Sequence, residues 1–416
     1  MASNRLQQIQ THLAPNPSAT STKVGVKSPE DVVVVSALRT AMTKGRKGGF
    51  KDMLPEDLLS GVFKGILNQT KLDPKLVDDI CVGNVAAPGG CATASRMAAL
   101  HAGFPHTTSV NTTNRQCSSG LQACVQIATA IQAGLIEVGI GAGVETMTHH
   151  FFSRKLNFSP KVTKESQEAA DCLLPMGITS ENVAAEWGLS RKDQDEFAVT
   201  SHAKAAAAQK AGFFKDEIVP IQATIVDKDG NEKTIVVDKD EGMREGTTVE
   251  VLAKLKPAFK ADGSTTAGNA SQVSDGAAGV LLMKRKTAQK YGLPILGKYV
   301  TSAVVGVPPN VMGIGPAFAV PVALERAGLK TDDVDIFELN EAFASQAVYT
   351  VQKLNIPMEK VNPKGGAIAL GHPLGCTGAR QVATLFPELK RQNKKIGCTT
   401  MCIGSGMGMA AIWERE

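Results

Sequence analysis

An internal repeat is the feature that most restricts the fold of this chain. Asp79–Asn84 (DICVGN) aligns with Asp335–Asn340 (DIFELN) at an offset of 256 residues, from position 79 to position 335. Gly120 and Gly378 lie 258 residues apart, and each opens a helical pattern that a further apolar run follows. The same strand–turn–helix–strand order therefore occurs twice, which predicts two similar α/β halves.

Short apolar runs between helical patterns predict buried strands at Asp31–Ser36, Ile80–Val85 and Val138–Gly143. Helices are predicted where apolar residues recur every three or four positions, at Glu56–Leu67, Leu121–Ala133 and Ala317–Ala327. This alternation is typical of parallel or mixed sheets covered by helices.

The alternation breaks roughly between Thr146 and Ser264. Arg191–Ala211 has a charged, helix-like pattern and Ile218–Asp238 an alternating, hairpin-like one. We interpret this stretch as an insertion, and insertions on a rigid scaffold often carry ligand contacts. The predicted division is an N-terminal extension (1–29), a first half (30–146), an inserted domain (147–264), a return to the first half (265–290) and a second half (291–416).

Composition excludes several classes of protein. No apolar run approaches the ~18 residues of a membrane span. The net charge is +5, Lys and Arg are scattered and aromatic residues make up only 5%, so nucleic-acid binding has little support. The eight cysteines come without a secretory signal or a Cys-x-x-Cys pair, which predicts free thiols and no metal site.

The first residues form a distinct segment without an apolar signal-peptide core. Arg5-Leu6, five residues and then His12-Leu13 resemble an N-terminal peroxisomal targeting signal at every fixed position. This predicts a peroxisomal location and an import receptor as a partner. The alternative is an ordinary frayed terminus.

Cys117 stands just before a helical pattern that starts near Ser119 and Gly120. Backbone N–H groups and the dipole at a helix start favour a thiolate and lower the pKa of a cysteine. We therefore expect a nucleophile with a lowered pKa. The alternative is a small buried hydrophobic residue.

His372 lies between two glycines in the turn Gly371-His372-Pro373-Leu374-Gly375. Glycine lets other groups approach closely and proline fixes the backbone. A histidine acts as a general base near neutral pH, so we expect that role here. The alternative is a histidine satisfied by hydrogen bonds within its turn.

Cys402 precedes Gly404, Gly406 and Gly408, and Asn340 follows a predicted strand. No helix, second strand and acidic residue follow the glycines at the spacing of a dinucleotide site. We expect the glycines to present backbone N–H groups to a developing oxyanion. Asn340 is expected to hold a water or an oxyanion, or to cap a helix.

Four segments in this order resemble the active-site signatures of the thiolase family: Asn114–Gly120, Asn340–Phe343, Gly371–Gly378 and Cys402–Gly408. The resemblance runs from about Asp31 to the C-terminus. It implies a five-layered αβαβα fold built from two similar halves, with an active site between them. It also implies an inserted loop domain that binds CoA, and a homodimer.

The resemblance also implies residue roles. Cys117, activated by His372, would attack a 3-ketoacyl-CoA and become acylated, and Cys402 would protonate the departing acetyl-CoA enolate. A second CoA would then release an acyl-CoA two carbons shorter. His372 and a water held by Asn340 would stabilise the enolate oxygen, and the N–H groups of Cys117 and Gly404 the tetrahedral intermediate. CoA is a co-substrate in this scheme, with no metal or redox cofactor.

For CoA itself, the resemblance points to Met176, Arg244, Ala267 and Ser271. Arg244 would lie by the nucleotide phosphates or base, and Ser271 would bond the pantetheine. These assignments place CoA across the inserted domain and the return to the first half.

Three other functions stay open at this point. A biosynthetic acetoacetyl-CoA thiolase would share every catalytic residue, and a non-catalytic acyl-CoA carrier could use the same scaffold. A decarboxylating ketoacyl synthase usually pairs one cysteine with two histidines, which Cys402 and Asn340–Phe343 argue against. Cys172 adds a separate hypothesis, a disulfide with Cys117 that would inactivate the enzyme under oxidation.

Overall fold

The computed structural model describes residues 22–151 and 157–416. The targeting residues Arg5, Leu6, His12 and Leu13 lie outside this range. The strands of the first half are β1 Val32–Arg39, β2 Thr43–Lys44, β3 Asp79–Gly83, β4 Ser109–Thr113, β5 Val138–Thr146 and β8 Ser274–Lys284. Those of the second half are β9 Gly297–Gly306, β10 Ile336–Leu339, β11 Ile396–Ile403 and β12 Met407–Arg415.

The described residues form a ten-stranded sheet whose two halves repeat one topology. The first half runs β4-β3-β5-β8-β1 and the second β10-β11-β12-β9, and β2 pairs with β8 at the margin. In each half a parallel pair (β3 with β5, β10 with β11) is followed by two antiparallel strands. The two half-sheets pair with each other where Val33 and Val34 of β1 lie opposite Lys298 and Gly297 of β9. The predicted repeat is confirmed for four strands of each half, and β4 has no counterpart among the named strands of the second half.

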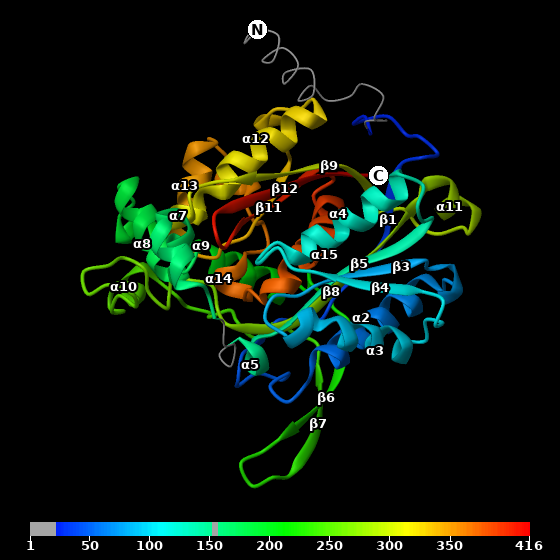
Figure 1. The fold of residues 1–416 in the computed structure, drawn as a ribbon, viewed down its shortest axis with the longest axis horizontal. Helices are drawn as coiled ribbons and strands as arrows, with labels where there is room; N and C mark the ends of the chain where they lie inside the picture. The colour runs from blue at the N-terminus through cyan, green and yellow to red at the C-terminus, as the bar shows by residue number, and fades with distance from the viewer. Residues whose placement is uncertain (1–21, 152–156) are drawn as a thin grey trace.

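Helices complete the layers. Their bounds in the two halves are α2 Pro55–Thr70, α3 Ala92–Ala102, α4 Ser119–Gln132, α11 Arg285–Lys290, α12 Gly315–Ala327, α13 Ala344–Lys353, α14 Ala367–Leu370 and α15 Leu374–Arg391. Helices α2 and α3 cover one outer face, α12 the other, and α13 packs beside α12 (Figure 1). Helices α4 and α15 lie between the two half-sheets: α4 packs on strands of the first half and on α15, and α15 contacts strands of both halves. This is the five-layered αβαβα arrangement that we expected. None of the described helices is long and apolar enough to span a membrane.

The insertion consists of helices of different lengths and one hairpin. Its elements are α5 Met147–His150, α6 Pro160–Glu165, α7 Gln167–Asp171, α8 Met176–Glu186, α9 Arg191–Lys210, β6 Ile221–Val226, β7 Glu232–Val237 and α10 Val249–Ala253. Helix α9 begins with a capping box between Ser190 and Asp193. The two-stranded hairpin projects from the body of the molecule (Figure 1). The helix and the hairpin predicted in this stretch are both present.

Glycines bring the first turns of α4 and α15 into backbone contact. A Cβ atom on Gly378 would lie 2.2 Å from the backbone nitrogen of Leu121, and one on Gly120 would lie 2.6 Å from the carbonyl oxygen of Gly375. Real Cβ atoms do not approach other atoms this closely, so only glycine fits either position. Because Gly120 and Gly378 are the repeat-related glycines, the helices meet at equivalent points. The turns that precede them, which carry Cys117 and His372, are thereby drawn toward the same place.

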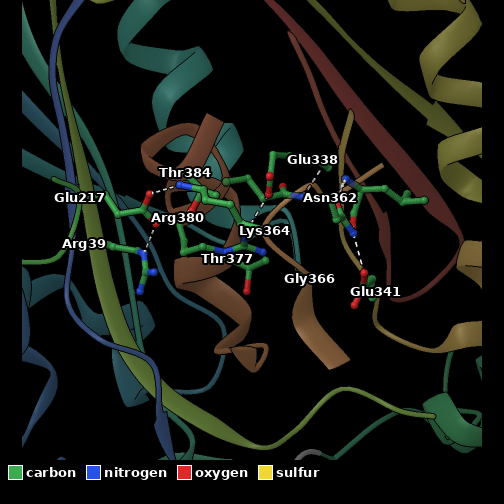
Figure 2. Close-up of polar contacts among 12 residues, drawn as sticks. Arg39, Glu217, Glu338, Glu341, Asn362, Lys364, Gly366, Thr377, Arg380 and Thr384 are labelled. Carbon is green, nitrogen blue, oxygen red and sulfur yellow. Dashed lines mark hydrogen bonds and ion pairs between the residues drawn. The ribbon is translucent and has the colours of Figure 1, made fainter. Parts of the chain in front are cut away.

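A buried ion network fixes the insertion to both halves (Figure 2). Arg39 on β1 donates through Nε to Glu217 at 2.8 Å, and its guanidinium pairs with Asp240 at 2.7 Å. Lys364, in the loop before α14, also pairs with Glu217. Arg380 on α15 pairs with Glu338 on β10 at 3.0 Å. All these groups are buried, so each charge depends on its partners for compensation.

Candidate active site

Cys117 lies in a turn that its own neighbours hold in shape. The side chain of Asn114 accepts a hydrogen bond from the N–H of Gln116, which has a left-handed φ of 47°. The N–H of Arg115 donates to the hydroxyl of Ser119 at 2.9 Å. Helix α4 begins at Ser119, so Cys117 stands just before the helix, as expected.

The electrostatic setting of Cys117 differs from our expectation. The thiol is buried, and the backbone N–H of Gly404 and its own N–H lie within hydrogen-bonding reach. These N–H groups favour the thiolate, but burial outweighs them and raises the pKa of Cys117 to about 11. The carboxylate of Glu145 raises the pKa further. The prediction of a lowered pKa was wrong, because the helix start acts here at a site closed to water.

His372 is held as a neutral imidazole. Its Nδ1 lies 2.7 Å from the hydroxyl of Thr377, and that hydroxyl donates its proton to the carbonyl of Pro373 at 3.1 Å. The Thr377 oxygen is then an acceptor, which assigns the ring proton to Nδ1 and a lone pair to Nε2. The amide Nδ2 of Asn340 lies 3.3 Å from Nε2 and donates to it. Burial, with Arg380 nearby, lowers the pKa of His372 to about 3, so the imidazole is uncharged near neutral pH.

Cys402 belongs to a β-hairpin. It lies on β11 opposite Gly408 of β12, and the chain turns at Gly404, Ser405 and Gly406. Ser405 and Gly406 have positive φ values of 65° and 90°, which such a tight turn requires. The glycine run thus forms a hairpin turn that directs the Gly404 N–H to Cys117. Cys402 is fully buried; burial and then the neighbouring Cys117 raise its pKa.

Asn340 follows β10 directly and does not cap a helix. The next helix, α13, begins at Ala344 with Phe343 as its N-cap residue. The amide nitrogen of Asn340 contacts His372, while its oxygen Oδ1 is buried without a hydrogen-bond partner among the described residues. A buried unpaired oxygen is costly and uncommon, so this one is suited to a donor that arrives with substrate.

Two of the four predicted CoA contacts adjoin this centre. Met176 opens α8, and its sulfur would lie 3.7 Å from a Cβ atom on Gly404. The N–H of Ser271 donates to the carbonyl of Ala342 at 3.0 Å, in the turn after Asn340. Arg244 and Ala267 are exposed, as a solvent-facing nucleotide would need.

Sequence reasoning missed three residues that orient this centre. Glu145, at the end of β5, accepts hydrogen bonds from Val85 N and Gly375 N and so links the two halves. Thr377 sets the tautomer of His372. The side-chain oxygen of Gln346 accepts a hydrogen bond from the thiol of Cys402 at 3.3 Å. A lone carboxylate closing an apolar run was a usable signal for Glu145. The other two belong to ordinary helical patterns and gave none.

Cys172 is exposed and lies beside the glycine turn. Its sulfur is 3.9 Å from the carbonyl oxygen of Ser405, next to the residue that contacts Cys117. The insertion therefore reaches the edge of the centre, and the Cys117–Cys172 disulfide stays a prediction. Within residues 22–151 and 157–416, no group of three or more His, Cys, Asp or Glu residues is placed to hold a metal ion.

Comparison with known proteins places the chain in a family. Residues 32–286 match the family described as thiolase, N-terminal domain, and residues 293–415 match thiolase, C-terminal domain. The chain is 54% identical over 413 residues to the peroxisomal 3-ketoacyl-CoA thiolase of Yarrowia lipolytica, covering 99% of this chain and 100% of that protein. The dimeric peroxisomal thiolase of Saccharomyces cerevisiae matches with a TM-score of 0.88 and 50% identity, covering 94% of this chain and 99% of that one.

A second structure, of peroxisomal 3-ketoacyl-CoA thiolase from Saccharomyces cerevisiae, is described as five-layered and constructed from two core domains of identical topology. It matches with a TM-score of 0.77 and 45% identity, covering 94% of this chain and 100% of that one. Its description agrees with the two repeated half-sheets and the helix layers found here. The chain therefore belongs to the thiolase family.

Proposed function

We propose that this protein is a degradative 3-ketoacyl-CoA thiolase, an acyltransferase of fatty acid β-oxidation. It would cleave a 3-ketoacyl-CoA with CoA to give acetyl-CoA and an acyl-CoA shortened by two carbons. The observation that carries the proposal is the nearness of two buried thiols, Cys117 and Cys402, together with the packing of the Cys117 turn against the turn that carries the neutral imidazole of His372. The names of the relatives, peroxisomal 3-ketoacyl-CoA thiolases, support the degradative reaction.

The first half-reaction begins from an uncharged pair. Because burial favours the neutral thiol of Cys117 and the neutral imidazole of His372, proton transfer between them accompanies attack on the substrate. The sulfur attacks C3 while the proton moves to Nε2. The N–H groups of Cys117 and Gly404 stabilise the oxyanion. The C2–C3 bond then breaks, leaving acyl-Cys117 and an acetyl-CoA enolate that takes its proton from Cys402.

The second half-reaction restores the protons. Between the half-reactions the proton on His372 passes to the Cys402 thiolate. The thiol of an incoming CoA then gives its proton to His372, and its sulfur attacks the acyl carbon of acyl-Cys117. As the thioester to Cys117 breaks, the sulfur of Cys117 takes the proton back from His372. Covalent catalysis thus divides a difficult carbon–carbon cleavage into two easier steps. The amide of Asn340 would hold His372 and a water against the enolate oxygen.

We further propose that CoA lies along Met176, Ser271, Arg244 and Ala267, with the reactive thioester by the first two. Their positions support this order, since Met176 and Ser271 adjoin the thiols while Arg244 and Ala267 are exposed. CoA would be a co-substrate, and none of the proposed steps needs a metal or redox cofactor.

A homodimer in the peroxisome completes the proposal. The dimeric state of the matched Saccharomyces cerevisiae thiolase supports the homodimer, and the peroxisomal relatives support the location. The import receptor would recognise Arg5, Leu6, His12 and Leu13, which lie outside the described residues.

The test is CoA-dependent cleavage of 3-ketoacyl-CoAs of increasing length, from four carbons to sixteen. We expect turnover on long chains that disappears in Cys117→Ala and persists in Cys398→Ala, a buried cysteine earlier on the strand that carries Cys402. Activity on acetoacetyl-CoA alone would indicate the biosynthetic enzyme. CoA binding without any turnover would indicate a carrier and refute the proposal.

A further inference from the structure

We propose that Gln346 is a positioning residue for Cys402, holding its thiol in the orientation that delivers a proton to the substrate carbon and receives it back. The inference rests on the proposed function, since it assigns Cys402 the proton transfer at C2. It adds a residue outside the four signature segments.

The contacts of the Gln346 amide oxygen carry the inference. Gln346 lies in the first turns of α13 and is only 1% exposed. Its Oε1 accepts hydrogen bonds from the thiol of Cys402 at 3.3 Å and from the N–H of Ala342 at 3.2 Å. The backbone bond fixes the oxygen, and the fixed oxygen in turn selects one direction for the S–H bond of Cys402.

The surroundings make this contact decisive for the thiol. Cys402 packs in an apolar cluster with Met312, Ala342 and Phe343, against which Met176 and Ala270 also pack. In such surroundings a hydrogen-bond acceptor has a strong orienting effect, because no water competes for the thiol proton. A freely rotating S–H group would point at the reacting carbon for only part of the time.

The other end of the same amide is unpaired. Nε2 of Gln346 is buried and has no hydrogen-bond partner among the described residues. A buried amide N–H without a partner is costly, and such groups often mark function. A glutamine amide offers both an acceptor and a donor. Its oxygen, fixed by the backbone bond, is the acceptor that holds the protonated thiol.

A purely structural role is the competing explanation. Gln346 also fills space, since a Cβ atom on Gly313 would lie 2.7 Å from the Cβ of Gln346. Methionine has nearly the same shape as glutamine and would fill that space equally well, but its thioether sulfur is at most a weak hydrogen-bond acceptor for the thiol. Gln346→Met therefore separates packing from positioning. Gln346→Glu keeps an oxygen at the same place.

The experiment compares two exchange reactions of the full-length enzyme. Exchange of labelled CoA into an acyl-CoA requires acylation of Cys117 but no proton transfer at C2. Exchange of the C2 hydrogens of acetyl-CoA with deuterated water requires Cys402. For Gln346→Met we expect C2 exchange to fall by about tenfold and CoA exchange to change by less than about twofold. Gln352→Met, on the exposed face of the same helix, is the matched control and should change neither reaction.

Gln346→Glu should retain more C2 exchange than Gln346→Met, because it retains an acceptor for the thiol. An equal loss of both exchange reactions in Gln346→Met and Gln346→Glu would overturn the inference in favour of packing, as would unchanged C2 exchange in Gln346→Met. Absence of C2 exchange in the unaltered enzyme, with CoA exchange intact, would instead refute the role proposed for Cys402. Absence of both reactions would refute the proposed function as a whole.

Discussion

The backbone contact between α4 and α15 leads to a specific prediction for Gly378→Ala. The added methyl carbon would lie 2.2 Å from the backbone nitrogen of Leu121 and 2.6 Å from its Cβ atom. Neither atom can move aside by a change of rotamer, so the two helices must separate. A normal van der Waals contact is about 3.5 Å, which requires a displacement of roughly 1 Å.

Two opposing contributions set the size of the effect on stability. Alanine in a helix interior is favoured over glycine by about 1 kcal/mol. Overpacking of a well-packed core costs typically 1–3 kcal/mol and occasionally more, and here the clash is with backbone. We expect a net loss of about 1–2 kcal/mol. Activity should suffer more, because a displacement of about 1 Å in the catalytic geometry can cost about a hundredfold in rate.

Thermal unfolding and thiolysis kinetics of Gly378→Ala test both parts. Gly306→Ala is the matched control, because nothing lies within 4 Å of the Cβ atom it would add. The control should stay within about 0.5 kcal/mol of the parent and keep its kcat. If Gly378→Ala were as stable and as active as Gly306→Ala, the claim that this glycine contact positions the active-site turns would be refuted.

Three further predictions concern the buried thiol of Cys117, the buried ion network and the exposed thiol of Cys172. The rate at which iodoacetamide alkylates Cys117, followed by peptide mapping, should rise about tenfold per pH unit from pH 6 to 9. The reason is that the pKa of about 11 leaves the thiol neutral over this range, so the reactive thiolate fraction grows tenfold with each unit. A rate independent of pH would contradict this. Arg39→Met should lower the unfolding free energy in urea by about 3–5 kcal/mol, because the buried carboxylate of Asp240 loses its ion-pair partner. Lys192→Met, in an exposed pair, should lower it by at most about 1 kcal/mol. Mild oxidation should join Cys172 to Cys117, and peptide mapping that finds no such link would end that hypothesis.

The fold was predictable because its signals are local. The strand–helix–strand units repeat in sequence, so one alignment of Asp79–Asn84 with Asp335–Asn340 indicated both half-sheets and the central helices. The positions of Cys117 and His372 before α4 and α15 followed from helix-start patterns. Each of these inferences needs only neighbouring residues and their periodicity.

The electrostatics of the site were not predictable in the same way. The pKa of Cys117 depends on how deeply the turn is buried, and no local pattern records the burial that two half-sheets and an insertion create together. The ion network of Arg39, Glu217 and Lys364 joins residues 178 and 147 positions apart. In the sequence alone, charged residues so far apart are expected to be exposed at the surface, although here their side chains are buried.

The repeat also explains how a nearly symmetric fold supports an asymmetric reaction. Asn84 and Asn340 are equivalent residues that each follow the first strand of a parallel pair. The Asn84 amide is satisfied by protein groups, since Nδ2 donates to Val144 O at 2.9 Å and Oδ1 accepts from Ala87 N at 3.0 Å. The Asn340 amide instead donates to His372, and its oxygen has no partner in the part of the chain that the structure describes. One copy thus uses the asparagine to hold its own backbone, while the other leaves it available to the reaction. The unpaired oxygen costs the second half free energy, and this cost is offset only when substrate or water donates a hydrogen bond to the oxygen. Asn340→Ala should therefore lower kcat. The equivalent Asn84→Ala should mainly lower the stability of the first half.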